Sequence, residues 1–109
     1  MKCLVKNEPA VGLTLKEKEK PSPKDNEILI KVKKAAICGT DLHIWNWDSW
    51  AQEKIKPPMT VGHEFMGVIE EVGKKIKNFK IGDRVSVESH ITGTKSRNCL
   101  LYTSDAADE

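Results

Sequence analysis

The stretch GHEFMGVIEEVG, residues 62–73, is the most informative part of this sequence for the fold. It opens with a glycine, a histidine and a glutamate, and it continues into a segment whose apolar side chains include Val68, Ile69 and Val72. The β-branched residues favour an extended conformation over a helix. We therefore predict a strand over residues 62–72, with side chains capable of chemistry at its start.

Further short strands are expected on both sides of this stretch. In residues 27–33 apolar and polar side chains alternate, which places Ile28, Ile30 and Val32 on one face of a strand. The other expected elements are strands at 2–6, 11–16 and 81–87, the first two paired, and a short helix at 42–50 capped by residues 38–41. Many short strands divided by glycine and proline predict a β-rich α+β fold, a compact barrel with little helix.

Composition narrows the class of protein. The 109 residues suffice for one domain of modest size, and 39% hydrophobic residues support a small core. A net charge of +2 is too small to indicate a nucleic-acid partner, and no apolar run approaches the roughly 20 residues that cross a bilayer. Three cysteines form no disulfide framework, so we expect a cytoplasmic protein. The sequence has no G-x-G-x-x-G segment, so we expect no dinucleotide site in this chain.

Residues that zinc prefers as ligands occur at three places in the chain. Cys38 follows an expected strand, His63 and Glu64 follow an extended proline segment, and His90 lies near the end of the last strand. Cys38 and His63 are 25 residues apart, so only the tertiary fold can bring them together. The residues alone leave three interpretations open. The first is a metal site, and the second is a cysteine–histidine nucleophile pair. The third is a buried cysteine with an ordinary core histidine.

Three motifs together give the chain a family resemblance. The segments ICGTDLH (37–43), GHEFMGVIEEVG (62–73) and GDRV (82–85) resemble the zinc-dependent medium-chain dehydrogenases, whose signature G-H-E-x-x-G-x-x-x-x-x-G is intact here. The resemblance implies that residues 1–98 are the N-terminal part of a GroES-like catalytic domain. It also implies that a Rossmann domain, which would bind NAD, is absent from this chain.

The resemblance also implies roles for individual residues. Cys38 and His63 match the thiolate and imidazole ligands of a catalytic zinc. Glu64 matches the carboxylate beside them, in the coordination shell or just outside it. Thr40 matches the hydroxyl of a proton relay, and His43 matches its next member. A further metal ligand is expected beyond residue 109.

The substrate expectation rests on a narrower likeness. The segment DLHIWNWDSW (41–50), with SHIT at 89–92, resembles the branch of the family that oxidises the C3 hydroxyl of L-threonine to 2-amino-3-oxobutanoate. In that branch His90 would line the substrate pocket, and the whole enzyme would be a homotetramer. The alternatives are a dehydrogenase of the sorbitol or butanediol type and a non-catalytic GroES-like module.

Two features near the C-terminus depart from the family. Many relatives hold a structural zinc with four cysteines in a lobe where this chain has Gly93, Ser96, Cys99 and Ala107. One thiolate cannot hold such an ion, so we expect no structural zinc. Residues 99–109 resemble one reading frame of a transposon adapter used in DNA library preparation, so we expect this tail to be non-native and residues 1–98 to be the native part.

Overall fold

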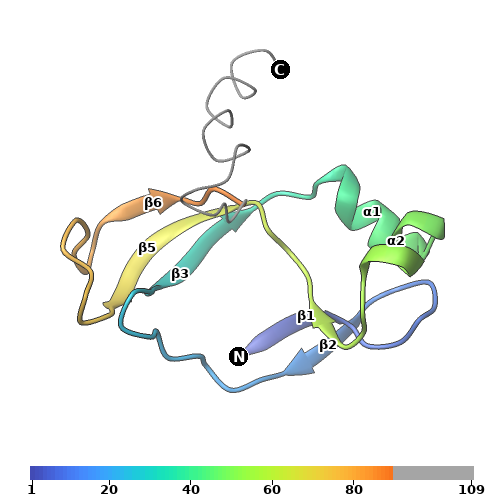
Figure 1. Cartoon of the computed structure of the whole chain (residues 1–109), viewed down its shortest axis with the longest axis horizontal. Coiled ribbons are helices and arrows are strands. Elements are labelled where there is room, and N and C mark those ends of the chain that lie inside the picture. The colour runs from blue at the N-terminus through green and yellow to red at the C-terminus, as the bar shows by residue number, and fades with distance from the viewer. Residues whose placement is uncertain (90–109) are drawn as a thin grey trace, which may run out of the picture.

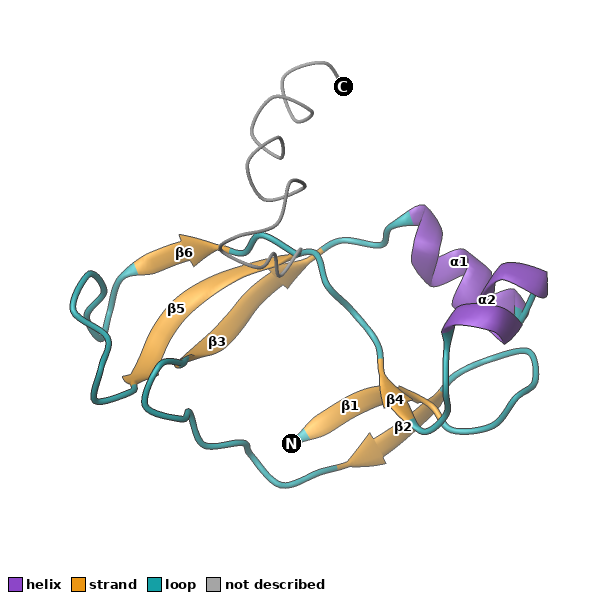
Figure 2. Cartoon of the chain, viewed as in Figure 1, coloured by secondary structure: helices purple, strands orange, loops and turns teal. Residues whose placement is uncertain are grey.

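The computed structural model describes residues 1–89, which form two separate three-stranded sheets and a pair of short helices (Figures 1 and 2). The first sheet has the strand order β2-β1-β4. Its central strand β1 (Lys2–Lys6) pairs antiparallel with β2 (Thr14–Glu17) and with the two-residue strand β4 (Met59–Thr60). The predicted pairing of the first two strands is therefore confirmed.

The second sheet has the order β3-β5-β6 and contains the signature stretch. β3 (Ile28–Ala35) pairs antiparallel with β5 (Phe65–Val72), which pairs in turn with β6 (Arg84–Ser86). Ile30 lies opposite Ile69, and the register shifts on either side of this pairing. The strand predicted over 62–72 thus begins three residues later, at Phe65.

Two glycines of the signature allow close contacts of the backbone in this sheet. A Cβ on Gly67 would lie 2.3 Å from the carbonyl oxygen of Lys31 on the neighbouring strand. A Cβ on Gly73 would lie 2.1 Å from the carbonyl oxygen of Lys24. Both distances are far shorter than a non-bonded carbon–oxygen contact, so Gly67 is required for the packing of β5 against β3 and Gly73 for the packing of the residue after β5 against the segment before β3.

The helical segment differs from the single helix expected at residues 42–50. α1 (Gly39–Asn46) ends at Trp47, whose φ of 54° is left-handed, and α2 (Ser49–Lys54) starts after an extended Asp48. The Asp48 side chain accepts a hydrogen bond from the Ala51 N–H and so caps α2. This cap is the local reason why a second helix begins there.

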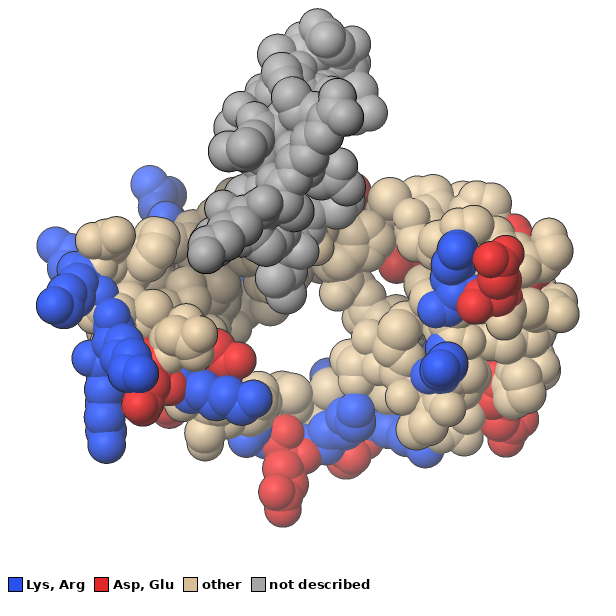
Figure 3. All heavy atoms as spheres, viewed as in Figure 1, with Lys and Arg blue, Asp and Glu red and all other residues tan. Residues whose placement is uncertain are grey.

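The buried apolar residues are few, and the two sheets do not close on each other. Within residues 1–89 the buried hydrophobic side chains are Cys3, Val5, Ile44, Ala51 and Ile69. Side chains of both sheets, including Leu4 and Val32, line a cavity of about 560 Å³, and Figure 3 shows an opening through the centre of the molecule. The β-rich fold class is confirmed, whereas over residues 1–89 the barrel is open.

Two further observations concern the surface. Lys and Arg side chains gather at the end of the molecule that carries the β5–β6 connection (Figure 3). In that connection Lys74, Lys75, Lys77 and Lys80 are all exposed, as expected of a solvated turn.

None of the helices in residues 1–89 has the length and apolar character needed to cross a membrane.

Candidate metal centre

The β3–β5 pair brings the distant ligand candidates together. At the end of the ladder Ala35 lies opposite Phe65, and the Ala36 N–H donates to the carbonyl oxygen of Glu64 at 2.9 Å. The residues after β3 and those before β5 are therefore adjacent in space. One ligand atom from each of Cys38, His63 and Glu64 falls within a group whose members are all within 4.8 Å of one another.

The three side chains fit a zinc ion by their chemistry. A thiolate, an imidazole and a carboxylate are the ligand types that zinc takes, at about 2.0–2.3 Å from the metal. Ligand atoms that all lie within 4.8 Å of one another are close enough to share one such ion. Cys38 and His63 are half-buried, whereas Glu64 is exposed, so the site is open to solvent on the glutamate side.

Asp41 joins the two half-buried ligand candidates, and the sequence interpretation gave it no role. Its Oδ2 accepts a hydrogen bond from the Cys38 backbone N–H at 2.9 Å. Its Oδ1 lies 3.7 Å from His63 Nδ1 and is buried without a hydrogen-bond partner in the described structure. A carboxylate behind an imidazole orients the ring toward a metal, so this orphaned oxygen supports the metal interpretation. The sequence signal that could have placed Asp41 beside Cys38 is the spacing Cys38-x-x-Asp41, which is typical of a helix start.

The two predicted relay residues occupy different surroundings. The Thr40 hydroxyl lies 3.6 Å from the Cys38 sulfur, so Thr40 adjoins the ligand cluster. His43 lies one helical turn further along α1, and its imidazole contacts Asp48 rather than the cluster. Its side chain is 55% exposed.

His90 lies outside the described residues, as do the four positions of the structural-zinc lobe and the tail at 99–109.

A cavity of about 440 Å³ opens beside His63 and Glu64. Its remaining lining comes from the end of β3, the start of β5 and the residues around β6. These residues are Lys34, Ala36, Phe65, Met66, Ser86, Val87, Glu88 and Ser89. The space is large enough for a small organic molecule next to the ligand cluster.

This chain is similar in sequence to named dehydrogenases and in structure to solved ones. A relative named L-threonine 3-dehydrogenase from Sinorhizobium fredii is 57% identical over 99 residues, which are 91% of this chain and 29% of that protein. Among solved structures, the zinc-dependent alcohol dehydrogenase 2 of Streptococcus pneumonia is 34% identical with a TM-score of 0.74, over 92% of this chain and 28% of that one.

A third similar structure is 2R,3R-butanediol dehydrogenase from Bacillus subtilis. It is 33% identical with a TM-score of 0.69, over 80% of this chain and 27% of that one. This chain therefore spans less than a third of the length of the proteins it resembles. The family model described as the alcohol dehydrogenase GroES-like domain matches residues 24–107. The chain belongs to the alcohol dehydrogenase GroES-like domain family.

Proposed function

We propose that this chain is the N-terminal part of a zinc- and NAD-dependent dehydrogenase that oxidises the C3 hydroxyl of L-threonine to 2-amino-3-oxobutanoate. The observation that supports the proposal is that ligand atoms of Cys38, His63 and Glu64 lie within 4.8 Å of one another. The name of the Sinorhizobium fredii relative supports the substrate. The proposal places the enzyme in the cytoplasm as a homotetramer.

The residues of this chain would hold the metal and remove a proton. Cys38, His63 and, on the open side, Glu64 would bind zinc, which when bound supplies the Lewis acidity that makes an alcohol easier to deprotonate. The Thr40 hydroxyl lies next to the Cys38 sulfur and would accept the proton of the substrate hydroxyl while it releases its own proton toward His43. His43, one turn further along α1, would pass that proton to solvent, to which its side chain is exposed.

The hydride acceptor would be bound by a part of the enzyme that this chain does not contain. The sequence has no glycine-rich dinucleotide motif, and positioning two reactants contributes roughly 7–11 kcal/mol to such a reaction. We expect the 109-residue chain to give no NADH signal with L-threonine. Its exposed apolar surface, which includes Ile37, Trp45 and Trp50, leads us to expect poor solubility.

The test is the zinc content of cysteine variants. Cys38→Ser should lose most of the zinc bound by the chain, because a hydroxyl is a poor substitute for a thiolate ligand. Cys3→Ala is the matched control, because Cys3 is buried in β1 and is not a member of the cluster. In the full-length enzyme that carries this chain, Cys38→Ser should also abolish most L-threonine oxidation. Zinc content and turnover equal to those of the wild type would refute the proposal.

The second candidate is a dehydrogenase of secondary alcohols such as butanediol, favoured by the similarity to the Bacillus subtilis structure. Assay of the full-length enzyme with L-threonine, sorbitol and butanediol separates the two activities. A non-catalytic GroES-like module has no need of a metal, so tight zinc binding that depends on Cys38 argues against that role.

A further inference from the structure

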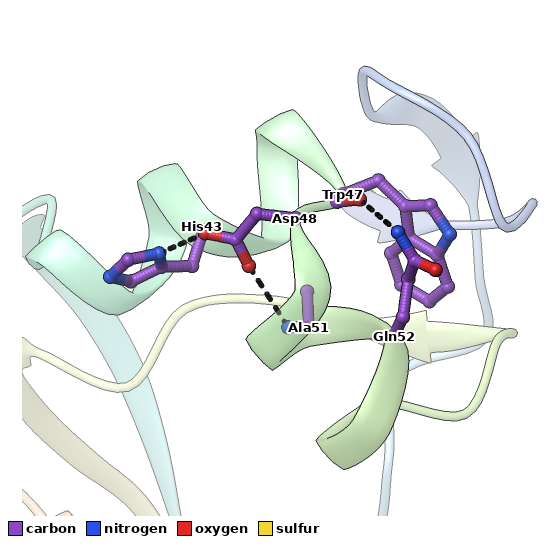
Figure 4. A network of polar contacts seen from close by, with 5 residues as sticks. All are labelled: His43, Trp47, Asp48, Ala51 and Gln52. Carbon is purple, nitrogen blue, oxygen red and sulfur yellow. Dashed lines mark hydrogen bonds and ion pairs between the residues drawn. The ribbon is translucent and has the colours of Figure 1, made fainter.

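The junction between α1 and α2 contains a polar network around one carboxylate (Figure 4). Asp48 Oδ2 contacts His43 Nδ1, and Asp48 Oδ1 accepts a hydrogen bond from the Ala51 N–H at 3.0 Å. The Trp50 ring lies beside the same imidazole, with 5.6 Å between ring centroids and a tilt of 44°. Two elements therefore hold the His43 ring, α1 through its backbone and the start of α2 through Asp48 and Trp50.

The chemistry of the contact determines where the imidazole proton lies. The His43 hydrogen bond, followed by the Ala51 backbone bond, lowers the pKa of Asp48 below its usual value, so this carboxyl is ionised near neutral pH. An ionised carboxylate only accepts hydrogen bonds. His43 Nδ1 must therefore carry a proton, and in the neutral ring the lone pair is on Nε2. Figure 4 shows Nε2 on the side of the ring that faces away from Asp48.

We propose that Asp48 is a positioning residue that holds His43 in the Nδ1–H tautomer, with Nε2 ready to accept a proton. The inference rests on the proposed function, because Asp48 affects catalysis only through the relay role of His43. It adds a residue outside the Cys38, His63 and Glu64 cluster to the catalytic machinery. The residue that caps α2 is therefore also the one that contacts His43.

The first experiment is nitrogen-15 NMR of selectively labelled histidine rings in the full-length enzyme that carries this chain, because the 109-residue chain alone is expected to be poorly soluble. In the wild type we expect the His43 signals of the Nδ1–H tautomer at pH 8. Asp48→Ser keeps a good helix cap but is too short to contact the imidazole, so we expect His43 to shift toward the Nε2–H form. Asp48→Asn can keep the cap with its single oxygen, but its NH2 group then replaces Oδ2 and donates toward His43 Nδ1, so we expect this variant also to shift the ring toward the Nε2–H form. A wild-type ring in the Nε2–H form, or an Asp48→Ser ring identical to the wild type, overturns the inference.

The second experiment is a double-mutant cycle in the full-length enzyme with His43→Ala and Asp48→Ser. We expect Asp48→Ser to lower kcat for L-threonine roughly tenfold, with KM and zinc content unchanged, as general acid–base groups contribute about 10²–10⁴-fold. In the His43→Ala background the same substitution should cause no further loss. If His43→Ala is impaired and Asp48→Ser is not, or if the two losses multiply, the inference alone fails. If His43→Ala has the wild-type kcat, the proposed relay itself fails.

Discussion

Lys6 is a lysine that folding removes completely from solvent. Its side chain is 0% exposed, and its Nζ donates hydrogen bonds to the carbonyl oxygens of Ala10 and Gly12. The ammonium also lies 5.2 Å from the centre of the Trp47 ring. Burial lowers the pKa of Lys6, because desolvation disfavours its charged form. Lys6 thus connects β1, the loop after it and the end of α1.

We expect Lys6→Ala to lower the free energy of unfolding by roughly 2–4 kcal/mol. Two carbonyl oxygens lose a charged donor, and hydrogen bonds to charged groups contribute about 1.5–3 kcal/mol each. Lys16→Ala is the control, since Lys16 is exposed and a surface substitution typically changes stability by about 0.5 kcal/mol or less. Urea unfolding followed by tryptophan fluorescence measures both. Equal stability of the two variants would contradict the role given to Lys6.

Asp48 should make part of the stability depend on pH. Its pKa in the folded chain is below the ordinary 3.8, first because of the His43 hydrogen bond and then because of the Ala51 N–H. A folded pKa below the unfolded one adds stability above the ordinary pKa, and this stability is lost as the pH falls through the folded pKa. Asp48→Asn keeps the cap but does not titrate. The stability difference between the two proteins should therefore shrink below about pH 4; a constant difference from pH 6 to pH 3 would contradict this.

The contact between β3 and β5 depends on Gly67. A Cβ there would lie 2.3 Å from the Lys31 carbonyl oxygen and 2.6 Å from Ile30 Cγ2, so the strands would have to separate. We expect Gly67→Ala to lower the free energy of unfolding by about 1–3 kcal/mol. Because this ladder places Cys38 next to His63, the same variant should also bind zinc more weakly.

Gly39→Ala is the matched control for that prediction. Gly39 is the first residue of α1, its Cβ would meet nothing within 4 Å, and alanine is favoured over glycine in a helix by about 1 kcal/mol. We expect this variant to be at least as stable as the wild type in urea. Equal destabilisation of the two alanine variants would mean that the strand contact is not the cause.

Zinc should stabilise the whole chain, because its ligands come from two segments that lie far apart in the sequence and are adjacent only in the folded state. Cys38 precedes α1, whereas His63 and Glu64 precede β5, and a ligand that binds only the folded state stabilises it. At a zinc concentration 100 times the Kd, the gain is about 2.7 kcal/mol. We expect a higher Tm with zinc, reversal by a chelator, and no response in Cys38→Ser. A response in that variant equal to that of Cys3→Ala would place the zinc elsewhere.

The amino-acid sequence by itself determined the local elements and the residue types of the candidate site. Alternation in residues 27–33 predicted β3 and the signature stretch predicted β5, whereas ligand chemistry left the metal interpretation open and the family resemblance selected Cys38, His63 and Glu64. These features are readable because side-chain periodicity and the ligand preferences of a metal are properties of short segments.

Only the tertiary structure decided which of these residues meet. The antiparallel pairing of β3 with β5 closes the gap of 25 residues between Cys38 and His63, and it places Asp41 against His63. The burial of Lys6 was equally invisible, because a lysine at the end of a strand is ordinarily exposed. The sharing of the Asp48 carboxylate between the cap of α2 and the His43 imidazole was also invisible, because it is a contact between two helices. Long-range pairing and burial arise from contacts between segments, so no local pattern records them.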